Sequence, residues 1–254
     1  TFNLSQYVDS VAYVKLQTLD DLVINRISRI KIFDNRIYIH DSKLKSLFVF
    51  DSKGLFLYSI RDVGGGPHEY IDLTQFCIDE INKLIVIYDL PRNRILNFNS
   101  KDGGFVSLVN VNERRSFARD FTLISNGDYL FYSYEKDGDA FSGLWLIDKF
   151  GNFKKSLFSY YNVYPVVPTE PNPVLIKMID ADLYSVFDVV NNVIYHFDGN
   201  NLTKVYSFDF TEIGIKTVSM FPGVTNLERF DNKIGDLVEV TGIQETNRII
   251  WNTW

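Results

Sequence analysis

The sequence has few of the residues that build disulfide frameworks and metal clusters. Among its 254 residues are one cysteine, Cys77, and three histidines. A single cysteine excludes an internal disulfide and any cysteine-based metal cluster, and we interpret Cys77, between Phe76 and Ile78, as a small buried hydrophobic residue. The histidines show neither H-x-x-x-H nor H-E-x-x-H spacing, which argues against a zinc enzyme. We therefore expect neither a metal nor a cofactor.

Long apolar runs and basic tracts are absent as well. No run of about 18 apolar residues exists, so no segment is expected to span a membrane. The net charge is −6, the pI is near 5.1, and no stretch is rich in lysine and arginine, which argues against a nucleic-acid partner. No G-x-S-x-G motif supports an α/β-hydrolase serine. The chain starts at Thr1 and not at Met, as after removal of a leader or trimming of the sequence.

Aromatic residues, in contrast, are abundant, and the chain carries an internal repeat. It has 21 Phe, 15 Tyr and 3 Trp, a composition that favours β-sheet. Asp51, Asn99, Asp148 and Asp198 each end an apolar strand, and they are 48, 49 and 50 positions apart. Asp or Asn followed by glycine supplies the turn of a tight hairpin. The glycines of these turns are Gly54, Gly103, Gly151 and Gly199.

Each of these hairpins follows another hairpin, so one repeat contains four strands. Four short strands in about 48 residues are the unit of a propeller blade. The second strands are apolar at successive positions, as in residues 84–88, which indicates burial on both faces and argues against a β-sandwich. We predict an all-β fold in which residues 1–254 form one β-propeller domain of four-stranded antiparallel blades. The expected blades are 27–60, 75–110, 117–158 and 174–208, with a partial blade at 236–254.

The repeat is followed by a glycine-rich loop that resembles one in a known family. Residues 63–70, Val-Gly-Gly-Gly-Pro-His-Glu-Tyr, come directly after the first blade. Together with the N-terminal strand at 10–18, they are similar to the six-bladed β-propeller lipoproteins of Bacteroidetes, which carry a G-x-G-P-x-E-Y loop at this place. The resemblance covers essentially the whole chain. It implies an exported protein, often lipid-anchored upstream of the chain start, that serves as a binding or scaffolding module more often than as an enzyme.

The sequence leaves open how the ring of blades closes. Six blades need about 290 residues at this period, whereas the chain ends within its fifth copy. We favour a six-bladed parent of which this chain is a truncated part. In the alternative, an N-terminal closing strand at 11–16 completes a five-bladed ring. In a third reading another chain covers the open blade, and the number of chains in the assembly stays undetermined.

Candidate ligand contacts lie on the face that gathers the long loops. When strands run from axis to rim, the loops between second and third strands and the connections between blades share one face, and binding residues concentrate on such loops. Tyr160, Tyr161 and Tyr164 cluster in a proline-bounded loop there, and exposed tyrosines are good platforms for sugars or peptides. Arg92 and Arg94 are candidates for an anionic ligand. The alternatives are tyrosines that cover the end of the core and arginines that are merely solvated.

The glycine-rich loop itself is interpreted as structural. A phosphate-binding loop needs a helix after its glycines, and here a strand is expected. We predict a connection from rim to axis that its own side chains hold in place, with His68 as a further candidate ligand contact. The residues assigned to this structural loop are Gly64, Gly66, Pro67, Glu69 and Tyr70.

Two functions remain under consideration. The first is a non-catalytic binding or scaffold propeller of the bacterial cell envelope, with a glycan or a protein as ligand. The second is a lyase or hydrolase acting on sugars, with its site at the axis on the long-loop face. An enzyme needs a funnel lined by convergent ionisable groups, whereas a scaffold is expected to have a plugged axis.

Overall fold

The computed structural model describes residues 12–18, 23–112, 118, 120–133, 143–160, 175–177, 182–188, 193–207, 243–245 and 250–252. Within these residues, the strands form four four-stranded sheets and one two-stranded hairpin. In each large sheet the spatial order of the strands is their order in the chain, and every pair is antiparallel. This confirms the prediction of an all-β propeller with four-stranded antiparallel blades.

The strands of the four blades have three to seven residues each. Blade 1 consists of β1 (Ile27–Phe33), β2 (Arg36–Asp41), β3 (Ser46–Asp51) and β4 (Phe56–Ile60). Blade 2 consists of β5 (Gln75–Asp79), β6 (Leu84–Asp89), β7 (Arg94–Asn99) and β8 (Phe105–Asn110), with a 3-10 turn, η2 (Leu90–Arg92), after β6. Blade 3 consists of β9 (Asp120–Leu123), β10 (Tyr129–Ser133), β11 (Gly143–Ile147) and β12 (Phe153–Ser159). Blade 4 consists of β13 (Leu175–Lys177), β14 (Tyr184–Asp188), β15 (Val193–Phe197) and β16 (Leu202–Ser207).

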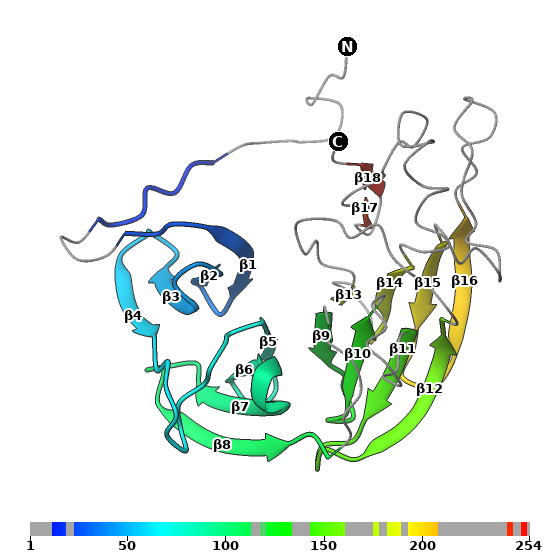
Figure 1. Cartoon of the computed structure of the whole chain (residues 1–254). Helices are drawn as coiled ribbons and strands as arrows, with labels where there is room; N and C mark the ends of the chain where they lie inside the picture. The colour runs from blue at the N-terminus through cyan, green and yellow to red at the C-terminus, as the bar shows by residue number, and fades with distance from the viewer. Residues whose placement is uncertain are drawn as a thin grey trace, which may run out of the picture.

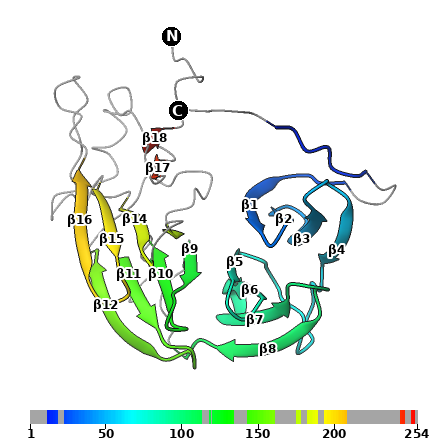
Figure 2. The ribbon, with the colours of Figure 1, turned by 180° about the vertical axis from the view of Figure 1, so that it is seen from behind.

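The blades follow one another along an arc around a common axis (Figure 1). The first strand of each blade lies on the inner side of the arc and the fourth strand lies on the outer side. Seen from behind, the short hairpin of β17 (Ile243–Glu245) and β18 (Ile250–Asn252) lies in the opening of the arc (Figure 2). It falls within the expected partial blade, most of which lies outside the described residues.

Turn chemistry explains the regular spacing of the second hairpins. The Oδ1 of Asp51 accepts hydrogen bonds from the amides of Lys53 and Leu55 at 2.9 and 2.8 Å. Gly54, in the same turn, has φ +84°, a conformation that only glycine adopts readily. Asp148 repeats this arrangement in blade 3. An acidic or amide side chain followed by glycine is therefore needed once in each blade.

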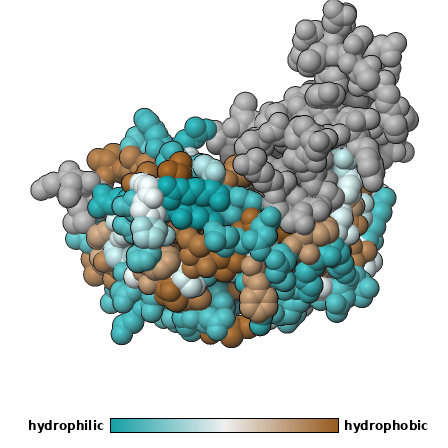
Figure 3. All heavy atoms as spheres, turned by 60° about the horizontal axis from the view of Figure 1, so that its bottom comes forward, coloured by the Kyte–Doolittle hydropathy of each residue, from teal (hydrophilic) through white to brown (hydrophobic). Residues whose placement is uncertain are grey.

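The core consists of aromatic and aliphatic layers between successive blades. Between blades 1 and 2, Tyr38 and Val49 pack with Phe76 and Ile87, all of them buried. Every residue of β10 is buried, so the second strands do face apolar neighbours on both sides. Burial of one such side chain contributes about 1.5–3 kcal/mol, so the stability of each blade depends strongly on its neighbours. The outer rim is mixed, with hydrophobic and hydrophilic side chains interspersed (Figure 3).

Residues 12–18 run along the outer part of blade 1 without being assigned to a strand. The amide of Gln17 donates to the carbonyl of Gly54 at 2.7 Å, and the Gln17 side chain accepts the amide of Phe56 at 3.0 Å. Leu16 packs against Phe50 and the other residues of a small cluster on the side of blade 1 that faces away from blade 2. The segment therefore covers part of an otherwise open blade face.

The same contacts recur where blade 2 meets blade 3. A Cβ on Gly54 would collide with the carbonyl oxygen of Lys15, and a Cβ on Gly151 would collide with that of Asn110. In both places the residue two positions further on donates its amide to the glycine carbonyl. Asn110 ends β8, the fourth strand of blade 2. Residues 12–17 thus contact the β3–β4 turn of blade 1 in the same way as the end of the fourth strand of blade 2 contacts the corresponding turn of blade 3.

Candidate functional site

A buried ion pair crosses the inner side of the arc. The Nη2 of Arg29 in β1 lies 2.8 Å from the Oδ1 of Asp120 in β9, and their side chains are 6% and 0% exposed. The same oxygen accepts the amide of Phe121, and the Oδ2 accepts the amide of Leu175 in β13 at 3.0 Å. One carboxylate therefore joins blades 1, 3 and 4. This level of the axis is therefore occupied by a buried ion pair.

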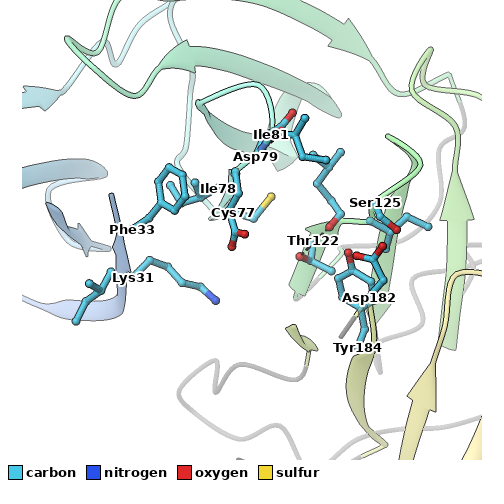
Figure 4. Close-up of a pocket in the computed structure, with 14 residues that line it drawn as sticks. Lys31, Phe33, Cys77, Ile78, Asp79, Ile81, Thr122, Ser125, Asp182 and Tyr184 are labelled. Atoms are coloured by element: carbon cyan, nitrogen blue, oxygen red, sulfur yellow. Dashed lines mark hydrogen bonds between the residues drawn. The ribbon is translucent and has the colours of Figure 1, made fainter. Parts of the chain in front are cut away.

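A pocket lies beside this pair, towards the short hairpin turns. Its volume is about 100 Å³. It is walled by the ends of β1, β5 and β9, by Tyr184 at the start of β14 and by Asp182 just before it, so that all four blades contribute (Figure 4). Its lining is Lys31, Ile32, Phe33, Cys77, Ile78, Asp79, Glu80, Ile81, Thr122, Leu123, Ile124, Ser125, Asp182 and Tyr184. We call it the axial pocket.

Lys31 extends into the axial pocket from blade 1 (Figure 4). Its side chain forms no hydrogen bond or ion pair in the described part of the chain. Burial lowers the pKa of Lys31 below its usual value of 10.5, and the nearby Arg29 charge lowers it further, while Asp120 acts in the opposite direction. An ammonium group without a fixed partner retains all three of its donors for a ligand.

Across the pocket from Lys31 lie polar groups of blades 3 and 4 (Figure 4). The hydroxyl of Thr122 lies 3.5 Å from the carbonyl of Leu123, a distance too long for a strong hydrogen bond. Ser125 and Asp182 are exposed at the pocket mouth. By contrast, the carboxylate of Asp79 is already used, because it accepts the amides of the following turn. Free donors and acceptors thus converge from different blades.

Two further residues that line the axial pocket are poorly suited to act as a nucleophile or a base. Cys77 is buried, as expected from its apolar neighbours, and burial raises the pKa of its thiol from 9.0 to about 12. A thiol in this state is not a nucleophile near neutral pH. Burial also raises the pKa of Tyr184 to about 12, so its hydroxyl stays protonated. Both residues contribute shape and hydrogen bonding.

Of the three candidate tyrosines, the structure describes Tyr160, which does not line this pocket. Tyr160 is buried between blades 3 and 4, where its hydroxyl donates to Asp188 and lies 3.1 Å from that of Tyr132. Burial raises the pKa of Tyr160 well above its usual value, and the neighbouring hydroxyl and carboxylate reinforce this. Tyr161 and Tyr164 lie outside the described residues. Their contact with a ligand stays a prediction.

The two candidate arginines bind the glycine-rich loop. Arg94 is buried, pairs with Asp89 at 3.0 Å and donates to the carbonyl of Glu69. Arg92 donates to the carbonyl of Gly66 at 3.3 Å. Both cations therefore have partners within the protein, and a role towards an anionic ligand stays a prediction.

The loop also holds itself in place. The carboxylate of Glu69 accepts the amide of Gly66 at 2.6 Å, and a side chain at Gly64 would collide with this carboxylate. Tyr70 is fully buried, and its hydroxyl lies within hydrogen-bonding distance of two carbonyl oxygens of blade 1. The ring of His68 stacks on Phe105 at 4.1 Å, and Pro67 is exposed beside it. The loop thus ties blade 1 to the rim of blade 2.

Sequence reasoning did not find the axial pocket, which lies towards the face of the short turns. Long loops suggested the opposite face, and large parts of those loops, such as residues 161–174, lie outside the described residues. One signal was available. Arg29 and Lys31 occupy alternate positions of an innermost strand, where side chains on the same side meet at the axis. Two basic residues there are unusual for a position expected to be buried.

The fold and the axial pocket define the class of protein: a β-propeller whose inner strands line a small cavity with both polar and apolar side chains. The match of its whole length, residues 1–254, shows that the chain belongs to the family described as Domain of unknown function (DUF4934). No curated protein matches the sequence. Among the described residues, none of the helices could cross a membrane, and no cluster of His, Cys, Asp or Glu could hold a metal ion.

Two solved structures are similar to this chain. One is a Bacteroides fragilis protein predicted to be exported, with a TM-score of 0.70 and 19% identity over 94% of this chain and 68% of that one. At this identity the likeness shows the fold alone. The other is a streptogramin B lyase, with a TM-score of 0.48 and 15% identity over 78% of this chain and 59% of that one.

Proposed function

We propose that this protein is a non-catalytic binding propeller of the bacterial cell envelope, with a glycan or a protein as ligand. The observation that carries this proposal is the Arg29–Asp120 pair, which occupies the axis as a buried ion pair whose carboxylate also accepts two backbone amides. The axial pocket beside it offers free hydrogen-bonding groups. It offers no activated nucleophile, because burial keeps the thiol of Cys77 protonated through its raised pKa.

The alternative, a carbohydrate-active lyase or hydrolase, is favoured by one observation. Charged side chains do meet at the axis, since Arg29, Lys31 and Asp120 come from neighbouring levels of the inner strands. Catalysis by acid and base requires groups that exchange protons with a substrate. Arg29 and Asp120 are instead buried and occupied by each other, which makes binding the better-supported function.

Location in the cell envelope is supported by two likenesses. The glycine-rich loop resembles that of exported, often lipid-anchored propellers, and a similar fold occurs in the Bacteroides fragilis protein predicted to be exported. The molecules available to a binding module at the envelope are mainly glycans and surface proteins. Export and a lipid anchor are therefore part of the proposal.

The proposal includes a six-bladed ring as the complete assembly. Residues 12–17 take the place of a fourth strand of a blade preceding blade 1, with the same glycine contact as between blades 2 and 3. The four blades leave the arc open between blade 1 and blade 4 (Figures 1 and 2). A ring in which residues 12–17 complete the last blade satisfies both observations, and the resemblance to six-bladed propellers is what favours six blades over five.

Binding and catalysis are separated by incubating the protein on an array of bacterial and host glycans. We expect retention on a subset of glycans, with the bound glycans keeping their mass when they are recovered and measured by mass spectrometry. Cleaved or unsaturated products that accumulate with time would establish the enzymatic alternative. Retention on no glycan, together with capture of a specific envelope protein, would select the protein ligand within the same proposal.

A further inference from the structure

We propose that the axial pocket binds one neutral sugar residue at the end of a glycan, with Lys31 and Ser125 as direct hydrogen-bonding partners. This inference rests on the proposed function and names its ligand.

The size of the pocket limits what enters it. A volume of about 100 Å³ is well below the roughly 300–1,000 Å³ of pockets that enclose a whole small ligand. A folded surface cannot enter such a space, and an oligosaccharide cannot be enclosed by it. A space of this size accepts part of one terminal ring, inserted end-on, and leaves the rest of the glycan outside.

The directions of the free polar groups favour a sugar over the tip of an amino-acid side chain. Lys31 projects from blade 1, while Thr122 and Ser125 belong to blade 3 and Asp182 lies next to β14 of blade 4 (Figure 4). A side chain carries its polar atoms at one point, whereas a sugar carries hydroxyls around its ring. Each hydroxyl both donates and accepts, so it can serve an ammonium, a hydroxyl or a carboxylate.

The blade 2 side of the pocket carries apolar side chains as well as the carboxylates of Asp79 and Glu80. The apolar part is formed by Ile78 and Ile81, and Ile81 is 76% exposed to solvent. A sugar ring has a C–H face that packs on aliphatic carbon while its hydroxyls point elsewhere. Burial of such a face removes apolar area from water at about 25 cal/mol per Å².

Charge favours a neutral sugar over an acidic one. Three carboxylates, those of Asp79, Glu80 and Asp182, and one ammonium line the pocket, which gives a formal balance of 1 − 3 = −2. The whole chain carries −6. A uronic or sialic acid would bring a further negative charge into this field, whereas a neutral hydroxyl brings none.

Among the lining side chains, Lys31 would gain the most favourable hydrogen bonding from such a ligand. Its ammonium is partly removed from water, and the lowered pKa shows that the site does not compensate its charge fully. A hydroxyl oxygen that accepts a hydrogen bond from the ammonium replaces part of the lost hydration. Removal of this donor leaves the sugar hydroxyl without a partner, which in general costs more than tenfold in affinity.

The test is a titration of the intact protein with methyl glycosides of glucose, galactose and mannose, and with glucuronic acid, followed by ligand-observed NMR. We expect saturable millimolar binding of at least one neutral glycoside, and binding of the acid at least tenfold weaker. Lys31→Met should weaken the binding at least tenfold and Ser125→Ala severalfold. Lys53→Met, which removes an exposed lysine in the β3–β4 turn, should leave it unchanged.

Equal binding by Lys31→Met and the unsubstituted protein would overturn the inference, as would saturation by none of the neutral glycosides. Because Ser125 is exposed, Ser125→Ala keeps the test valid if Lys31→Met fails to fold. Glycan-array retention that survives both substitutions would overturn this site but leave the proposed function standing. Product formation on the array would overturn the proposed function.

Discussion

The guanidinium of Arg29 in β1 and the carboxylate of Asp120 in β9 form a buried ion pair at 2.8 Å, which joins the first blade to the third. Asp120→Asn leaves the guanidinium without its counter-charge in a buried place. Loss of one partner from a buried pair typically costs about 3–5 kcal/mol. We expect the free energy of unfolding, measured with urea, to fall by this amount.

The matched control is Asp34→Asn at an exposed pair. The carboxylate of Asp34 lies 3.8 Å from the Nζ of Lys83, and both side chains are more than half exposed. Exposed pairs contribute at most about 1 kcal/mol, and Asn tolerates the positive φ of this position. Equal losses for the two substitutions would show that the axial pair is not a structural element.

Gly54 tests whether residues 12–17 act as a blade strand. Gly54→Ala places a methyl group on the carbonyl oxygen of Lys15, so we expect the segment to detach. The loss comprises about 1 kcal/mol for the positive φ and a further ~1–2 kcal/mol for the packing of Leu16. Hydrogen exchange at residues 12–18 should rise to the rate of an unprotected chain.

Gly199→Ala is the control for backbone strain alone. Its φ is +93°, but no heavy atom lies within 4 Å of the added Cβ. We expect the loss of about 1 kcal/mol without any change in exchange at residues 12–18. If both substitutions leave that protection intact, the assignment of residues 12–17 to a fourth-strand position is wrong.

His40 makes stability depend on pH. Burial, and then the Arg29 charge, lower its pKa from 6.5 to about 4, and its Nδ1 lies 2.7 Å from the hydroxyl of Ser28. Below pH 6.5 the imidazole of His40 binds a proton in the unfolded chain, whereas in the folded protein it stays neutral until about pH 4. The free energy of unfolding should therefore fall by about 1.4 kcal/mol per unit between these values.

Urea unfolding at several pH values, compared with His40→Gln, isolates this contribution. The variant should lack the additional slope between pH 6.5 and 4, whatever its stability at pH 7. Parallel pH profiles of the two proteins would contradict the assignment of the slope to His40.

Cys77 should be inert in the folded protein. With a pKa of about 12, roughly one thiol in 10,000 is ionised at pH 8, against about a tenth at the ordinary pKa of 9.0 in an unfolded chain. We expect labelling by a disulfide reagent at pH 8 to be about a thousandfold slower than in urea. Complete labelling of the folded protein within minutes would mean that the axial pocket opens much more widely than the structure shows.

The blades were predictable because their turns depend on neighbours in sequence. Asp51 and Asp148 accept amides of their own turns, so their spacing reveals the repeat directly. The axial pair was not predictable, since Arg29 and Asp120 are 91 positions apart and meet only because the blades curve. The criterion of convergent charged groups was also too coarse, because it did not distinguish a saturated pair from groups open to a substrate.

The candidate ligand residues show a second limit. Tyr160 directly follows β12, and the sequence does not reveal whether its side chain turns inwards. It packs inside, against Phe158. From the sequence alone, Arg94 could equally be a solvated surface residue. In the structure, an ion pair with Asp89, five positions earlier, holds it inside the blade. Such choices depend on the neighbouring blade, which a local pattern does not contain.

The most direct test of the account is NMR of the protein whose lysines carry ¹³C-methyl groups, with Lys31→Arg used to assign the Lys31 signal. We expect the Lys31 signal to titrate at lower pH than the signals of exposed lysines such as Lys53, because burial lowers its pKa. Addition of a neutral methyl glycoside should shift the Lys31 signal in a saturable manner and leave that of Lys53 in place. A Lys31 signal that titrates with the exposed lysines and does not move with any glycan retained on the array would contradict a binding propeller that uses its axial pocket.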